Sequence, residues 1–109
     1  QIAGLRAMCV VQEMFGVRGE NGALCLRPQL LPEQFDVRNQ TSIILKFGGK
    51  TFKIVYTLLE RLEPSEYIIV RAELDNMPIA DGRILPSEMG ALDKEKIHIV
   101  EAWLGRKVQ

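Results

Sequence analysis

The chain has 109 residues, of which 47% are hydrophobic and 26% charged, and its 14 basic and 14 acidic side chains give a formal net charge of zero. This length fits one domain, which buries about two thirds of its unfolded surface. Nucleic-acid-binding domains usually have a basic patch or a high isoelectric point, so the pI near 6.8 argues against that class. The sequence lacks an apolar run of about 18 residues, so no membrane-spanning helix is predicted.

Residues 2–15 predict a helix whose surface is apolar nearly all round. The apolar positions of its two faces are Leu5, Met8, Cys9 and Phe15 on one side, and Ala3, Ala7, Val10, Val11 and Met14 on the other. Gly16 follows where the end of a helix needs a left-handed residue, a conformation that glycine adopts without a Cβ clash. The helix is therefore predicted to end at residue 15.

A helix this apolar needs packing partners on two sides, and the strands that follow can cover only one. The chain also begins within the helical pattern, at Gln1, without a capping residue. We therefore expect a part of a longer protein, with a trimmed terminus as the alternative. In the chain by itself, we expect the helix at residues 2–15 to associate with a second copy as a two-fold dimer.

The first strand is predicted at 23–27, and an irregular connection follows at 28–40. Two further strands, at 41–47 and 50–57, are joined by Gly48-Gly49, which is a hairpin signal because primed two-residue turns need positive φ. This turn pairs Leu45 with Phe52 and Ile43 with Ile54, and it pairs Lys46 with Thr51 on the opposite face. The turn and the apolar pattern thus predict the same register.

Later strands are predicted at 66–74, 77–80, 83–86 and 96–104, with a polar loop at 87–95 that has room for a short helical turn. In strand 66–74, alternation places Ile68, Val70, Ala72 and Leu74 inward. The predicted core contains Leu24, Leu26, Ile43, Leu45, Phe52, Ile54, Ile68, Val70 and Leu74.

Short strands with regular turns are typical of an antiparallel β-sandwich. We expect a mainly β, jelly-roll-like sandwich preceded by one α-helix. A mixed sheet with parallel strands is not expected, because no further helix is predicted that would serve as the crossover.

The sequence contains few candidates for catalytic residues. Glu60, Glu63, Glu66 and Glu73 are of the type used in pairs for glycoside hydrolysis, but they fall in a loop and on the outward side of a strand, where solvated charge is the simpler interpretation. The single histidine, His98, has no nucleophile or carboxylate beside it in sequence, so an ordinary strand histidine is favoured over a general base. The three serines Ser42, Ser65 and Ser87 lie outside any nucleophile-elbow context.

The two cysteines, Cys9 and Cys25, match neither a disulfide framework nor a zinc pattern, so we interpret both as small buried hydrophobes in a reducing, cytoplasmic compartment. With one histidine, no clustered metal site is expected, and neither a catalytic nor a cofactor-binding residue is assigned. Tyr56, Tyr67 and Trp103 offer ring faces on which sugars can stack, although Trp103 is better interpreted as an anchor in the core or between domains.

An ordered set of these turn-and-strand patterns carries a family resemblance. It begins with Phe15-Gly16-Val17-Arg18-Gly19, continues with Pro28, Leu31-Pro32 and Phe35, and includes the hairpin from Phe47 to Tyr56. It ends with Leu74 to Ile79, Ile84 to Pro86, and His98 to Gly105. Taken in order over nearly the whole chain, these segments resemble the C-terminal domain of glycoside phosphorylases of the cellobiose and chitobiose phosphorylase type, which include relatives acting as cyclic glucan synthetases and β-oligoglucan phosphorylases.

This resemblance implies that residues 1–16 are the last helix of an upstream helical barrel and that residues 17–109 are a C-terminal β-sandwich. In that family the general acid is an aspartate of the barrel, and inorganic phosphate, the co-substrate, is held by barrel loops upstream of Gln1. Gly4-Leu5 resembles the pair that opens the last helix, with Leu5 in place of the usual tryptophan. The resemblance therefore implies a domain without catalytic residues that braces the catalytic barrel of a bacterial enzyme acting on β-linked oligoglucosides. A free-standing carbohydrate-binding module and a protein-interaction sandwich are the alternatives.

Overall fold

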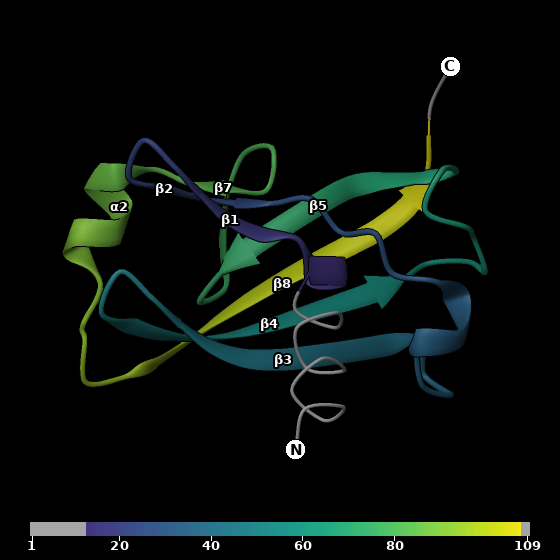
Figure 1. Ribbon diagram of the computed structural model, residues 1–109, viewed down its shortest axis with the longest axis horizontal. Helices are drawn as coiled ribbons and strands as arrows, with labels where there is room; N and C mark the ends of the chain where they lie inside the picture. The colour runs from purple at the N-terminus through teal and green to yellow at the C-terminus, as the bar shows by residue number, and fades with distance from the viewer. Residues whose placement is uncertain (1–12, 108–109) are drawn as a thin grey trace.

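The computed structural model describes residues 13–107, which form two β-sheets and only short helices (Figure 1). The small sheet has the order β1 (Val17–Glu20), β2 (Ala23–Leu26), β7 (Arg83–Ile84). The large sheet has the order β3 (Gln40–Phe47), β4 (Lys50–Leu58), β8 (Ile97–Arg106), β5 (Tyr67–Leu74), β6 (Met77–Pro78). A 3-10 turn, η1 (Pro32–Gln34), and one short helix, α2 (Pro86–Ala91), lie in the connections. Over the described range, neither sheet closes into a barrel.

The main core lies between the two sheets, where the alternating apolar side chains of each sheet meet. Leu24 and Ile84 of the small sheet are fully buried, as are Phe52, Ile54 and Tyr56 of β4. The remaining members of this cluster include Leu26, Leu30, Leu58, Leu62, Val100, Ala102 and Leu104. The fold is therefore mainly β and mostly antiparallel, as the sequence predicts.

The β3–β4 hairpin confirms the predicted register. Ile43 lies opposite Ile54, Leu45 opposite Phe52, and Lys46 opposite Thr51. Gly48 and Gly49 both have positive φ, at 59° and 78°, which a primed two-residue turn requires. The hairpin is local in sequence, so its turn chemistry and its apolar pattern are enough to specify it.

The prediction that no parallel pairing occurs is wrong. β8 lies between β4 and β5, parallel to β4 over eight residue pairs and antiparallel to β5. The crossover from β4 to β8 passes through β5, β6, β7 and α2, so a helix directly after the strand is not required. Ala102 lies between Tyr56 and Ala72 in this arrangement, and its small side chain leaves room for the tyrosine ring.

The predicted faces of β5 are right for its second half and wrong for its first. The ladder with β8 shifts between Ile69 and Arg71, so Val70 bulges out of the register. As a result Tyr67 is buried and Ile69 packs against the core, whereas Ile68 and Val70 are 43% and 46% exposed. The run from Tyr67 to Val70 is apolar at every position, so alternation cannot reveal which phase the fold selects.

The sequence also misses β1, which pairs with β2 across a two-residue turn at Asn21-Gly22. Both turn residues have positive φ, at 52° and 85°, so this is a second primed hairpin. Gly19 belongs to this strand, and a Cβ there would lie 2.7 Å from the Phe47 ring. The glycine lets β1 approach the edge of the large sheet closely.

The predicted end of the first helix is confirmed, since residues 13–15 are helical and Gly16 has a φ of 67°. The rest of the predicted helix, residues 2–12, lies outside the described residues, as does Cys9. Two predicted strands are shorter than expected, at Met77–Pro78 and Arg83–Ile84. The second ends early because Pro86 begins α2, where its fixed φ suits the first helical position.

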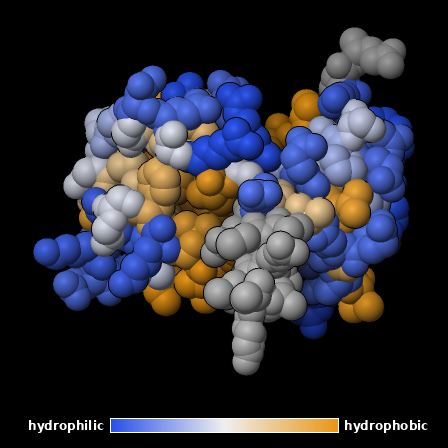
Figure 2. Space-filling model, in the orientation of Figure 1, coloured by the Kyte–Doolittle hydropathy of each residue, from blue (hydrophilic) through white to orange (hydrophobic). Residues whose placement is uncertain are grey.

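The small sheet leaves part of the large sheet's inner face open. Figure 2 shows apolar surface in the middle of one face of the molecule, between the β1–β2 hairpin and β3, with hydrophilic side chains around it. On β3, the inward residues Ile43, Leu45 and Phe47 pack against the core but are only partly buried. The apolar face of this edge strand is thus incompletely covered.

Candidate functional site

Four places are candidate sites: the point where the helical end meets the sheets, a groove on the outer face of the large sheet, a groove between β2 and β5, and the buried histidine. We call the first the joint, made of residues 13–16 and the groups that bind them. The groove on the outer face is named the Trp103 ledge, after the aromatic ring that lines it together with Leu59, Val70, Arg71, Glu73 and Glu101.

Backbone hydrogen bonds hold the joint. The Gly16 N–H donates to the Glu13 carbonyl oxygen over 3.0 Å, which closes the last helical turn. The Gly16 carbonyl in turn accepts the Arg27 N–H at 2.9 Å, and the Met14 carbonyl accepts the Gln29 N–H at 2.7 Å. A Cβ at residue 16 would lie 1.9 Å from the Arg27 carbonyl oxygen, so only glycine fits here. The carbonyl groups that a helix end leaves unpaired are thus bound by the chain after β2.

Two buried tyrosines add side-chain bonds and cannot serve as sugar platforms. The Tyr56 hydroxyl donates to the Phe15 carbonyl oxygen at 2.5 Å, and the Tyr67 hydroxyl donates to the Leu30 carbonyl oxygen at 2.8 Å. Burial raises the pKa of both phenols, that of Tyr67 to about 12. The Phe15 ring lies 5.3 Å from the Tyr56 ring and is 1% exposed. The hypothesis of stacking on these tyrosines is therefore wrong.

Trp103 lies half-buried on the outer face of β8, in the groove of about 380 Å³ that forms the Trp103 ledge. The Arg71 guanidinium lies 5.2 Å from the centroid of its ring and forms an ion pair with Glu73. Glu101 lies directly opposite Glu73 across the β5–β8 ladder. An aromatic ring beside carboxylates is a reasonable surface for a sugar or a cation, but a cation of the chain itself already lies over the ring.

The other acidic candidates form no catalytic pair in the fold. Glu60 forms an ion pair with Arg106 at 3.0 Å, and the Glu66 carboxylate accepts the Glu63 N–H at 2.8 Å, so both carboxylates already have partners within the fold. Glu60, Glu63 and Glu66 are exposed, as expected for solvated charge. The three serines Ser42, Ser65 and Ser87 are exposed as well.

A second groove, of about 480 Å³, opens between β2 and β5. Its lining includes Arg27, Arg83 and Asp81. The groove therefore carries both positive and negative charge and favours neither anionic nor cationic ligands. Cys25 lines it as a buried free thiol, with its Sγ 3.6 Å from a carboxylate oxygen of Glu20. These contacts indicate packing and a local hydrogen bond, not a reactive thiol.

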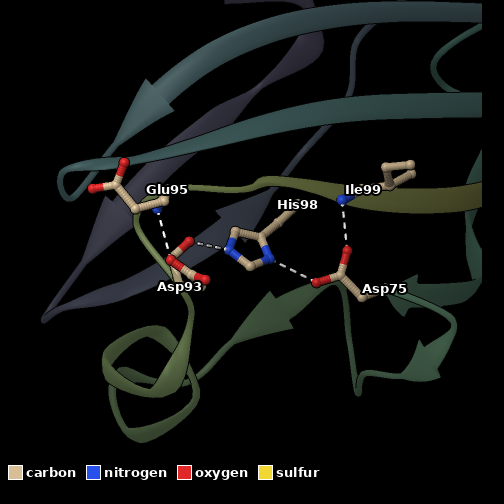
Figure 3. A network of polar contacts seen from close by, with 5 residues as sticks. All are labelled: Asp75, Asp93, Glu95, His98 and Ile99. Atoms are coloured by element: carbon tan, nitrogen blue, oxygen red, sulfur yellow. Dashed lines mark hydrogen bonds and ion pairs between the residues drawn. The ribbon is translucent and has the colours of Figure 1, made fainter.

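His98 is the most unusual polar side chain of the described chain. Only 5% of its surface is exposed, and both of its ring nitrogens have hydrogen-bond partners (Figure 3). Its Nδ1 lies 2.7 Å from an oxygen of the Asp75 carboxylate, and its Nε2 lies 2.7 Å from the Asp93 carbonyl oxygen. Asp75 belongs to the β5–β6 turn and Asp93 to the loop between α2 and β8. The ring thus connects β8 to the β5–β6 turn, 23 residues earlier, and to the loop that leads into β8.

Asp75 is itself held by hydrogen bonds to the backbone of Ile99 in β8. Its second carboxylate oxygen accepts the Ile99 N–H at 2.8 Å (Figure 3). Its own N–H donates to the Ile99 carbonyl oxygen at 2.8 Å. Burial lowers the pKa of His98, but the hydrogen bonds to Asp75 and Asp93 outweigh it and raise the pKa above its ordinary value near 6.5. Both ring nitrogens are occupied, so His98 has no free nitrogen with which to accept a substrate proton.

Sequence reasoning missed the Asp75–His98 pair because 23 residues separate the two groups. Asp75 and Asn76 form a turn with positive φ at both residues, and Asp75 meets His98 only because β8 lies beside β5. In the described part of the chain, no group of three or more His, Cys, Asp or Glu side chains is placed to hold a metal ion. Residues 13–107 also contain no helix long and apolar enough to span a membrane.

Comparisons with known proteins add no family assignment. No protein-family model matches the chain, and no curated protein matches it significantly.

Proposed function

We propose that this chain is a non-catalytic C-terminal domain of a cytoplasmic carbohydrate-active enzyme of the glycoside phosphorylase type, acting on β-linked oligoglucosides. In this proposal residues 17–109 form a jelly-roll-like β-sandwich that braces the helical catalytic domain before it. The inorganic phosphate and the catalytic groups belong to that upstream domain.

The joint is the observation that carries this proposal. Its helical turn is bound by two backbone hydrogen bonds from the segment after β2 and by one from the Tyr56 hydroxyl, and Phe15 is buried beside them. A flexible tether needs no such bonds, whereas a brace must fix the direction in which the helix leaves the sheets. The partly covered apolar face of β3 supports the same proposal, because a preceding domain would offer it a packing surface.

A carbohydrate-binding module is the second candidate, and the Trp103 ledge is the observation that favours it. Against it, Tyr56 and Tyr67 are buried, and Arg71 lies over the ring of Trp103. A module that binds sugar by stacking would need to displace this guanidinium first.

Two assays on the full chain distinguish these functions. Incubation with β-linked oligoglucosides and inorganic phosphate is expected to give background levels of sugar 1-phosphate. Turnover that disappears in His98→Gln or in Glu73→Gln would contradict a non-catalytic role. Because Trp103 is the single tryptophan, its fluorescence reports directly on the ledge.

In the second assay the same oligoglucosides are titrated against that fluorescence, and we expect no saturable change. Arg71→Ala is the matched variant, since it uncovers the ring while leaving Trp103 in place. Saturable quenching by sugar in the wild-type chain would favour the carbohydrate-binding module and overturn the proposed role.

A further inference from the structure

The contacts of His98 have a consequence for its protonation. Both of its ring nitrogens face acceptors, a carboxylate oxygen of Asp75 and the carbonyl oxygen of Asp93, each at 2.7 Å. A carbonyl and a carboxylate cannot donate, so both ring nitrogens must carry protons for both bonds to exist. That requirement is met by the imidazolium and by neither neutral tautomer.

The neutral ring would lose one particular contact. The tautomer with its proton on Nδ1 keeps the charge-assisted bond to Asp75 and turns a lone pair toward the Asp93 carbonyl. The other tautomer points a lone pair at a carboxylate, which is the less favourable arrangement. Loss of the proton therefore breaks the bond to Asp93 and preserves the bond to Asp75.

At its start the loop that contains Asp93 is attached through Leu92, which packs against the core, and from Asp93 onward it has few other attachments. The Glu95 N–H donates to the Asp93 carboxylate at 2.8 Å and the Lys96 N–H donates to the Asp93 carbonyl at 3.3 Å, so both of these bonds stay within the loop. The bond from His98 is the side-chain hydrogen bond that holds the Asp93 part of the loop against β8 (Figure 3). The loop follows α2, whose own Met89 is buried near the β3–β4 turn at Gly48.

We propose that His98 is a proton-dependent staple: its imidazolium fastens the α2–β8 loop to β8, and the loop is released when the ring loses its proton. The titratable groups that face the ring are Asp75 from the β5–β6 turn and Asp93 from the loop. From β4 the neighbour is the uncharged Phe52, whose ring lies 5.9 Å from that of His98. Both facing groups are acids, so they favour the charged ring together.

The direction of the pH dependence follows from the direction in which the pKa of His98 is shifted. The pKa of His98 is raised in the folded chain, against the pull of burial, by its bonds to Asp75 and Asp93. Stabilisation by the staple is therefore fully present below about pH 6.5, the ordinary histidine value, and is lost as pH rises through the folded pKa. Release is expected at neutral to alkaline pH and not in acid.

The single histidine makes the test direct, because one ring signal reports its titration. The full chain is titrated by NMR, and 13Cα relaxation order parameters of Glu95 and Lys96 are measured at about pH 5 and about one unit above the His98 pKa. We expect a His98 pKa above 6.5 and loop order parameters that fall from about 0.85 to below about 0.6. Ile99, whose bond to Asp75 survives, is the internal control and stays rigid.

Asp75→Asn supplies a matched variant of the same shape. An amide can donate to Nδ1 while its oxygen still accepts the Ile99 N–H, so the neutral ring then satisfies both sides with its proton on Nε2. This variant is expected to have a lower His98 pKa and to keep the loop rigid at both pH values. A wild-type His98 that titrates at or below 6.5, or a loop whose order is the same at both pH values, would overturn the staple.

Discussion

Removing the Tyr56 hydroxyl tests the side-chain part of the joint. Tyr56→Phe keeps the buried ring and deletes the donor to the Phe15 carbonyl oxygen, to which the hydroxyl lies at 2.5 Å. Phe15 is 1% exposed, so solvent cannot readily replace the lost donor. Leaving a buried acceptor unpaired costs about 1–3 kcal/mol, and we expect the free energy of unfolding to fall by about 2 kcal/mol.

Urea denaturation measures this loss, and the slope of the transition should be unchanged, because the variant exposes the same surface on unfolding. Tyr67→Phe is the matched control, since that hydroxyl is also buried but donates to Leu30, outside the joint. Both variants should lose similar stability and should speed global exchange equally, while only Tyr56→Phe should speed exchange of the Gln29 N–H, which is bound to Met14, by more than it speeds exchange of the β4 amides. A loss below about 0.5 kcal/mol in Tyr56→Phe would refute the role given to this bond.

Five further substitutions test the core, the bulge and the glycine at the joint. Phe52→Ala, at a fully buried ring, should lower the free energy of unfolding by about 3–5 kcal/mol in a denaturant titration, and a loss below about 1 kcal/mol would contradict its placement. Ile69→Ser should destabilise the chain by more than about 2 kcal/mol, whereas Ile68→Ser, at an exposed side chain, should cost less than about 1 kcal/mol. The reverse order would mean that β5 alternates regularly, with Ile68 facing the core. Gly16→Ala should cost about 2 kcal/mol or more, because its Cβ meets the Arg27 carbonyl, whereas Gly22→Ala, with its nearest atom at 3.4 Å, should cost about 1 kcal/mol; equal melting curves would contradict this.

The parts of the fold that are predictable from sequence are those fixed by neighbours in the chain. Gly48-Gly49 specifies a turn that aligns Leu45 with Phe52, and Gly16 ends a helix through its own backbone preference. Each of these features depends on a few adjacent residues. Their physical cause is visible in the sequence.

The parts that were missed depend on distant pairing. The bulge at Val70 is decided by the ladder with β8, and the parallel neighbour of β4 is decided by where β8 inserts. The environment of His98 needs both, because Asp75 reaches the ring across that same ladder. The surroundings of Trp103 could not be predicted for the same reason, because Arg71 and Glu73 lie beside Trp103 only when β5 and β8 pair.

The central claim is that the helical end is held as firmly as the sheets. Native-state hydrogen exchange of the Arg27 and Gln29 N–H groups tests it directly, because these groups donate to Gly16 and Met14 of the joint. A rigid joint opens only when the whole domain unfolds, so their opening free energies should lie within about 1 kcal/mol of the most protected amides of β4. Values lower than those of β4 by about 3 kcal/mol or more would mean that the joint frays independently and does not brace a preceding domain.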